Sequence, residues 1–227
     1  MEEMIDTQVT EHLDAEVVAG QAAYTPGFLP YYDLLVLRIN NPLLWKCPTS
    51  ELLELYNRNV SALHLDVGVG SGYYLENCRF ATDQPTLALM DLNSNSLRFV
   101  RERLSRYHDV RLFRRNVLEP VTIDSTYDSL GMNYLLHCLP GRIEDKAKRV
   151  FDNLQGCVKP GGTVFGSTLL YEGSAGLNRA VLKLYQRSGA MSNRWDSMEG
   201  LERALESSFR RHSVTRRGIV AMFSATV

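Results

Sequence analysis

A glycine-rich turn at the end of a short apolar run constrains this chain more than any other feature. The run reaches Asp66 and passes directly into a turn with three glycines, Gly68, Gly70 and Gly72. Glycine lets the backbone take positive φ angles and lets a ligand approach the main chain closely. Because a helical pattern follows, the segment has the strand, turn and helix context of a cofactor site in an α/β sheet.

The spacing of the glycines separates two classes of cofactor. The dinucleotide fingerprint is G-x-G-x-x-G, in which the third glycine lets the helix pack closely on the strand. Here the order is G-x-G-x-G, and Tyr73 occupies the position that the dinucleotide motif gives to glycine. A bulky side chain there argues against a pyrophosphate over this turn, so a dehydrogenase is the weaker interpretation.

From Ser61 onward, short apolar runs alternate with helical stretches, which is typical of a parallel sheet with crossover helices. We therefore predict an α/β domain over residues 61–227, with a longer interval at 171–196 as an insertion. The predicted strands are ALHLDVG, TLALMD, VRLFRRNV, YDSLGMNY, GTVFGSTLL, HSVTRRG and IVAMFSATV, and the predicted helices cover 73–78, 94–107, 141–157 and 198–208. In residues 1–60, Leu and Tyr recur at helical spacing between prolines, so we expect a broken helical segment there.

Composition and charge exclude several classes of function. The 25 basic and 26 acidic residues give a formal net charge of −1, so no overall field attracts a nucleic acid. No apolar run approaches ~18 residues and the amino terminus lacks the pattern of a signal peptide, so we expect neither a membrane span nor secretion. Four scattered cysteines without C-x-x-C spacing indicate reduced thiols in a cytoplasmic protein.

An acidic residue followed by G-x-G-x-G, from Asp66 to Gly72, resembles the first motif of the class I S-adenosylmethionine-dependent methyltransferases. Further segments resemble that family in order, up to the Pro-Gly-Gly turn at 160–162. The resemblance implies a Rossmann-like, doubly wound, mostly parallel sheet of seven strands, with the last strand antiparallel. It also implies S-adenosyl-L-methionine as cofactor and S-adenosyl-L-homocysteine as product.

The resemblance assigns cofactor-binding positions along the chain. Asp91 ends the second predicted strand, where a carboxylate can accept hydrogen bonds from both ribose hydroxyls. Asn116 stands where the family usually has an acidic residue facing the adenine amino group, which is a departure, although the amide oxygen can still accept a hydrogen bond. The predicted cofactor-binding residues are Tyr32, Asp66, Gly68, Gly70, Gly72, Asp91, Leu92, Asn116, Val117 and Asn133.

Methyl transfer from a sulfonium requires an enzyme mainly to align the reactants and exclude water, and a base only when the acceptor must lose a proton. His137 follows the fourth predicted strand and is our candidate catalytic residue, as a base or to orient the substrate, because imidazole titrates near neutral pH. A packing role is the alternative. His64 lies inside the first predicted strand, where a hydrogen-bonded core histidine is expected.

Aromatic side chains are the candidates for the acceptor pocket, because their faces suit both a sulfonium and an apolar acceptor. They lie in the amino-terminal segment, which we expect to be a lid, after the fourth predicted strand, and in the 171–196 insertion. The predicted substrate-binding residues are Tyr24, Tyr134, Tyr171, Tyr185 and Trp195. Ordinary core packing is the alternative for each of them.

Several methyltransferase classes do not fit. The segment after the fourth predicted strand reads Asn-Tyr-Leu-Leu, without the Pro-Pro-aromatic run of nucleic-acid amino-group enzymes, and there is no Pro-Cys pair for a cytosine-carbon enzyme. We see no acidic cluster that would hold a metal ion. The prediction is a metal-independent enzyme, monomer or homodimer, that methylates a small secondary metabolite or quinone-like compound. The alternative is a protein of this fold that binds the cofactor without transferring methyl, as a regulatory partner or in a rearrangement.

Overall fold

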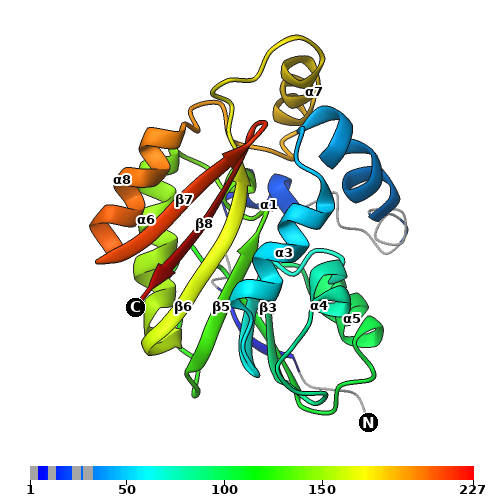
Figure 1. Cartoon of the computed structure of the whole chain (residues 1–227), viewed down its shortest axis with the longest axis vertical. Coiled ribbons are helices and arrows are strands. Elements are labelled where there is room, and N and C mark those ends of the chain that lie inside the picture. The colour runs from blue at the N-terminus through cyan, green and yellow to red at the C-terminus, as the bar shows by residue number, and fades with distance from the viewer. Residues whose placement is uncertain (1–4, 10–13, 22–26, 28–32) are drawn as a thin grey trace.

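The computed structural model describes residues 5–9, 14–21, 27 and 33–227. One eight-stranded sheet runs through these residues in the order β1-β4-β3-β2-β5-β6-β8-β7, with helices on both of its faces (Figure 1). The strands are β1 Asp6–Gln8, β2 Leu63–Val67, β3 Thr86–Asp91, β4 Val110–Arg115, β5 Tyr127–Asn133, β6 Val158–Leu169, β7 Arg211–Arg217 and β8 Val220–Thr226. The helices are α1 Ala15–Gln21, α3 Thr49–Asn59, α4 Tyr73–Asn77, α5 Ser94–Arg103, α6 Ile143–Leu154, α7 Gly176–Arg187 and α8 Met198–Ser208, with a π-helix η1 Asp33–Leu44 and short 3₁₀ turns η2 Leu136–Cys138 and η3 Gln155–Cys157.

The sheet confirms the predicted topology in its main features. Strands β4, β3, β2, β5 and β6 pair in parallel, and the last strand, β8, is antiparallel to both β6 and β7. The expected Pro-Gly-Gly turn lies inside β6, where the pairing with β5 shifts register between Tyr127 and Ser129. The two glycines there therefore belong to an irregularity in the strand and not to a turn before it.

The predicted number of seven strands was wrong by one, because β1 adds an eighth. Its three residues are exposed and show no alternation of apolar and polar side chains, so the sequence gives no strand signal. Pairing with the edge of β4 creates the strand, with Asp6 opposite Phe113. The Arg115 guanidinium also contacts the Asp6 carboxylate at 2.8 Å.

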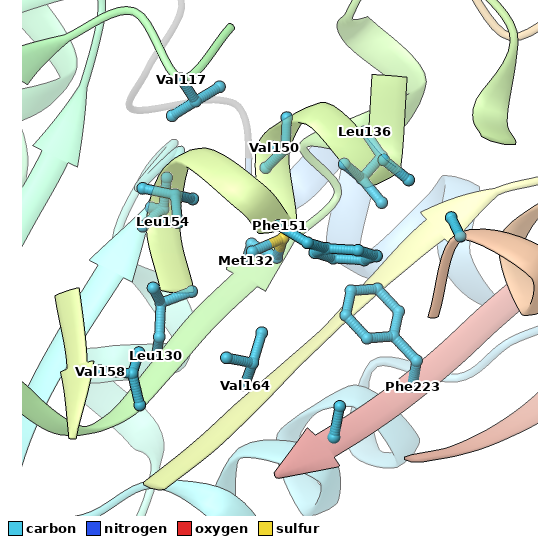
Figure 2. Packing of buried hydrophobic residues seen from close by; sticks show 14 of the residues in the cluster. Val117, Leu130, Met132, Leu136, Val150, Phe151, Leu154, Val158, Val164 and Phe223 are labelled. Carbon is cyan, nitrogen blue, oxygen red and sulfur yellow. The ribbon is translucent and has the colours of Figure 1, made fainter. Parts of the chain in front are cut away.

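Two apolar layers hold the helices to the sheet. On one face, Phe151 of α6 lies against Phe223 of β8, with ring centroids 5.6 Å apart, as Figure 2 shows. On the other face, α3 buries Leu52 and Tyr56. Burying a side chain of this size contributes roughly 1.5–3 kcal/mol. Because both faces are covered, the central strands read as continuous apolar runs.

Helices α3 and α1, both from residues 1–60, lie in different places. Helix α3 packs against β6 and β8 as part of a covering layer. Helix α1 contacts η2, which follows the end of β5. The two helices are so close that a Cβ at Gly20 of α1 would lie 2.8 Å from the carbonyl oxygen of Cys138 in η2. Within the described ranges, no helix is long and apolar enough to cross a membrane.

Candidate functional site

The turn between β2 and α4 has the backbone geometry that its glycines predict. Gly68, Gly70 and Gly72 have φ angles of 71°, 53° and 73°, in the left-handed region. A Cβ at Gly68 would lie 2.9 Å from the Leu135 side chain, and one at Gly72 would lie 2.6 Å from Val100. The turn therefore needs glycine both for its backbone and for its close packing.

A pocket opens beside this turn at the carboxyl ends of β2, β3 and β4. These ends meet at one edge because the strands are parallel. The pocket brings together six of the predicted cofactor-binding residues: Gly68, Gly70, Asp91, Leu92, Asn116 and Val117. We call it the first pocket.

The Asp91 carboxylate, at the end of β3, lines the first pocket. It accepts a hydrogen bond from the Asn93 backbone N–H at 2.8 Å, and the N–H groups of Gly70 and Val69 also stabilise it. Burial outweighs these donors and raises the pKa of Asp91 to about 6.

Asn116 also lines the first pocket, but its amide has partners within the loop after β4. The side-chain oxygen accepts from the Leu118 backbone N–H at 3.1 Å, and the amide nitrogen donates to Glu119 at 3.0 Å. These contacts fix the turn, so any hydrogen bond from an adenine amino group would use the second lone pair of the amide oxygen.

A second pocket of about 460 Å³ lies on the other side of the glycine turn. It is lined by the predicted residues Asp66, Gly68, Gly70, Gly72, Asn133 and Tyr134. Gly68, Gly70 and Tyr134 line both pockets. The turn therefore separates two pockets that share part of their walls.

Asp66 is held in a buried hydrogen-bond network. The Tyr56 hydroxyl donates to its carboxylate at 2.8 Å, and the His64 Nε2 atom lies 3.4 Å from the same oxygen. His64 Nδ1 lies 2.8 Å from the Ser129 hydroxyl, so this side chain is the hydrogen-bonded core histidine that we expected. Sequence reasoning missed Tyr56, which reads as an ordinary apolar position of the α3 helix pattern.

Tyr134 follows β5 with a φ angle of 58°, which is unusual for a bulky residue. Its hydroxyl donates to Asn41 of η1 at 3.0 Å, and its backbone N–H donates to the Ser167 carbonyl at 2.9 Å. The neighbouring Asn133 side chain accepts from the Ser167 hydroxyl. These contacts hold Tyr134 between the two pockets.

His137 does not line either pocket. Its ring is buried, packs edge-on against Tyr134 at 5.5 Å, and accepts a hydrogen bond from the Leu169 backbone N–H at 3.3 Å. Burial, together with the Lys146 ammonium, lowers the pKa of His137 to about 3. Its imidazole is therefore neutral at pH 7, and the catalytic role stays a prediction from the sequence alone.

The predicted substrate-binding residues of the 171–196 insertion divide between two places. Tyr171 and Trp195 line a cleft of about 1440 Å³ between the insertion, α1 and the start of α6. Tyr185 instead packs on Trp45 with ring centroids 6.5 Å apart and lies 3.3 Å from the Asn40 side-chain amide. Tyr24 and Tyr32 lie outside the described residues.

A charged cluster that sequence reasoning missed joins η1 to the glycine turn. Arg103 of α5 contacts the Asp33 carboxylate at 2.6 Å and donates to the Ser71 carbonyl at 3.0 Å. The Ser71 hydroxyl donates to the other oxygen of Asp33, and Arg103 also pairs with Glu76. We call these four residues the Arg103 cluster.

Comparison with known proteins identifies the family. Residues 65–164 match the family model of a methyltransferase domain. Demethylluteothin O-methyltransferase of Streptomyces thioluteus is 40% identical over 220 residues, covering 95% of each chain. This chain belongs to the class I S-adenosylmethionine-dependent methyltransferases. This methyltransferase also resembles the physcion biosynthesis cluster O-methyltransferase of Aspergillus chevalieri. The two are 36% identical over 211 residues, which cover 91% of this chain and 94% of that one.

The fold of this methyltransferase is shared with solved structures. DhpI in its complex with SAH superposes with a TM-score of 0.62 at 15% identity, over 94% of this chain and 97% of that one. The enzyme uses S-adenosylmethionine, and the first pocket fits such a cofactor. Its walls place the Asp91 carboxylate beside the apolar side chains of Leu92 and Val117, a lining that suits the ribose and the base of a nucleoside.

Proposed function

We propose that this methyltransferase transfers a methyl group from S-adenosylmethionine to an oxygen atom of a small secondary metabolite. The observation that carries the proposal is the 40% identity, over 95% of both chains, with a demethylluteothin O-methyltransferase. The relative from a physcion biosynthesis cluster is an O-methyltransferase as well. Both names favour oxygen as the methylated atom.

The pockets suggest how this chain holds its cofactor. Asp91 accepts hydrogen bonds from the ribose hydroxyls, and Leu92 and Val117 cover the adenine ring. In the second pocket, Asp66 and Asn133 face the polar end of the methionine part. We base these roles on the position of each side chain in the pocket walls.

The reaction is an in-line displacement. The acceptor oxygen forms a bond to the methyl carbon, and the carbon–sulfur bond breaks with its electron pair remaining on sulfur. The cofactor supplies a positively charged sulfonium that becomes a neutral thioether. The chain aligns the reactants and excludes water, which is the main requirement of such a transfer.

No histidine lines the two pockets in the described part of the chain. The Cys138 thiol lines the first pocket, but burial raises its pKa to about 12. Neither a histidine nor the Cys138 thiol therefore serves as a base near pH 7 in these pockets. We propose that the acceptor enters the site with its oxygen already ionised, so that the transfer leaves no proton to be removed.

An acceptor screen tests this function. The enzyme is incubated with methyl-labelled S-adenosylmethionine and a panel of hydroxylated aromatic and quinone-like compounds, together with their amino analogues, and products are measured by mass spectrometry. We expect label on hydroxyl-bearing compounds only. Label on the amino analogues alone would contradict oxygen as the acceptor atom, and cofactor binding without any transfer would favour a non-transferring protein of this fold.

A further inference from the structure

The cleft beside the 171–196 insertion gathers positive charge from several segments. Arg142 precedes α6, Lys183 and Arg187 lie on α7, and Arg194 follows that helix. Glu16 of α1 is the acidic residue among the described residues that line it. We call this feature the basic cleft. It stands out because the chain as a whole has a formal net charge of −1.

These four cations lie beyond ion-pair distance of every carboxylate among the described residues, although Arg142 helps to lower the pKa of the Glu144 carboxylate. Elsewhere, arginines that join segments do have a carboxylate partner, as in the ion pairs of Arg115 with Asp6 at 2.8 Å and Arg203 with Glu144 at 2.9 Å. Within the same described ranges, Arg142, Lys183, Arg187 and Arg194 form no ion pair within 4.0 Å. Like charges in one concave site repel each other and attract an anion.

Trp195 gives the basic cleft a flat apolar surface. Its side chain is 61% exposed, unlike Trp45, which is 1% exposed. The guanidinium groups of Arg194 and Arg142 lie 5.4 Å and 6.0 Å from the indole centroid. Both guanidinium groups lie over the indole, and the rest of this exposed ring offers apolar area for a flat ring beside donors for an anionic group on that ring.

The basic cleft adjoins the first pocket through shared segments. Helix α1 places Glu16 in the cleft and Val17 and Gly20 in the first pocket. The loop after η2 likewise has Leu139 in the pocket and Gly141 in the cleft. The basic cleft and the first pocket therefore lie on different sides of the same two segments and have no lining residue in common.

We propose that the basic cleft binds the methyl acceptor as a flat organic anion, with its ring on Trp195 and its charged group between Arg142 and Arg194. This inference rests on the proposed function for the identity of the ligand as acceptor. It adds that the acceptor is selected by its negative charge. A conjugated ring with a carboxylate, separate from the oxygen that receives the methyl group, has this chemistry.

Calorimetric titration with two probes tests the cleft. The probes are 2-naphthoate and 2-naphthamide, which share a flat ring and differ in charge. We expect naphthoate to bind at least tenfold more tightly than naphthamide. The double variant Arg142→Ala/Arg194→Ala should lose at least tenfold in naphthoate affinity and retain naphthamide affinity within threefold. A matched control, Arg149→Ala/Arg210→Ala, removes two exposed arginines that line no part of the cleft and should bind both probes as the parent enzyme does.

Several results of these titrations would contradict the proposal. Equal affinity for the two probes, no binding of either, or an equal loss in the control variant contradicts charge selection in the cleft. Titration of the same proteins with S-adenosylmethionine should give unchanged affinity in both double variants. Lack of cofactor binding by the parent enzyme would instead refute the proposed function. An acceptor found by the screen that does not compete with naphthoate would contradict the cleft as the acceptor site.

Discussion

The carboxylate of Asp91 links cofactor binding to pH. Burial raises its pKa to about 6, and only the ionised carboxylate can accept hydrogen bonds from two ribose hydroxyls through both oxygens. Protonation removes one acceptor, so affinity is lost as the pH falls through about 6 and is regained as it rises. We predict that S-adenosylmethionine binds about tenfold more weakly at pH 5 than at pH 7.5, since one pH unit below the pKa leaves roughly a tenth of the ionised form.

Calorimetric titrations from pH 5 to pH 8 measure this dependence. Asp91→Asn, which cannot titrate, should bind weakly at every pH and show a flat profile. A flat profile in the parent enzyme would contradict the role of Asp91.

The glycine at position 68 can be tested against a glycine with the same backbone but different surroundings. Gly68 has φ 71° and lines both pockets, whereas Gly161 has φ 81° and a Cβ there would have no other atom within 4 Å. Alanine at Gly161 should lower the free energy of unfolding by roughly 1–2 kcal/mol because of the left-handed backbone. Alanine at Gly68 should lower it further, because its Cβ would also lie 2.9 Å from the Leu135 side chain. We predict that only Gly68→Ala weakens S-adenosylmethionine binding at least tenfold, about 1.4 kcal/mol.

Denaturant unfolding and calorimetry of the two variants provide the comparison. An equal effect of both on cofactor affinity would mean that loss of stability, and not loss of the turn geometry, weakens binding.

A buried ion pair connects α6 with the insertion after β6. The Lys146 ammonium lies 3.0 Å from Asp196 and also donates to the carbonyl oxygens of Leu139 and Ser192. Burial raises the pKa of Asp196 to about 7, although Lys146 opposes the shift. We predict that Lys146→Met lowers the free energy of unfolding by about 3–5 kcal/mol, because it leaves a buried carboxylate without its partner.

The double variant Lys146→Met/Asp196→Leu should recover most of this loss, as measured by urea unfolding, because no buried charge remains. If the double variant is less stable than Lys146→Met, the ion pair is not the reason for the loss.

The Arg103 cluster joins η1 to the turn that contacts the cofactor. Because the Arg103 side chain is only 18% exposed, its pair with Asp33 is shielded from solvent more than a surface pair. We predict that Arg103→Met increases amide exchange in η1 by about tenfold, or 1.4 kcal/mol of lost protection, and weakens cofactor binding. Arg98→Met, an exposed arginine on the same helix, serves as the control and should change neither.

Hydrogen exchange with and without S-adenosylmethionine measures both effects. Unchanged exchange in η1 of Arg103→Met would contradict the role of the cluster in holding that helix.

Over the whole chain, the sequence predicts those site residues that belong to short local motifs. Gly68 and Asp91 stand at the ends of apolar strands, and parallel pairing then brings them into one pocket. Contacts between segments that are distant in the sequence leave no local motif from which they could be predicted. Arg103 and Asp33 are 70 positions apart and meet only in the folded chain, and β1 exists only through its pairing with β4.

His137 shows why position in the sequence does not fix the use of a side chain. It follows β5, as a catalytic residue of a parallel sheet commonly does. However, the 3₁₀ turn η2 buries the ring among Tyr134, Leu169 and the nearby Lys146. The direction of a side chain in a single short turn depends on tertiary packing, which the sequence pattern does not report.

The most direct test of the account is calorimetric titration of the parent enzyme and Asp91→Ala with S-adenosylmethionine, S-adenosylhomocysteine and NAD. Asp83→Ala, an exposed aspartate away from both pockets, is the matched control. We predict micromolar binding of the first two ligands to the parent and the control, no binding of NAD, and at least tenfold weaker binding to Asp91→Ala. Binding of NAD in preference to S-adenosylmethionine, or equal affinity of Asp91→Ala and the parent, would contradict the assignment of this pocket.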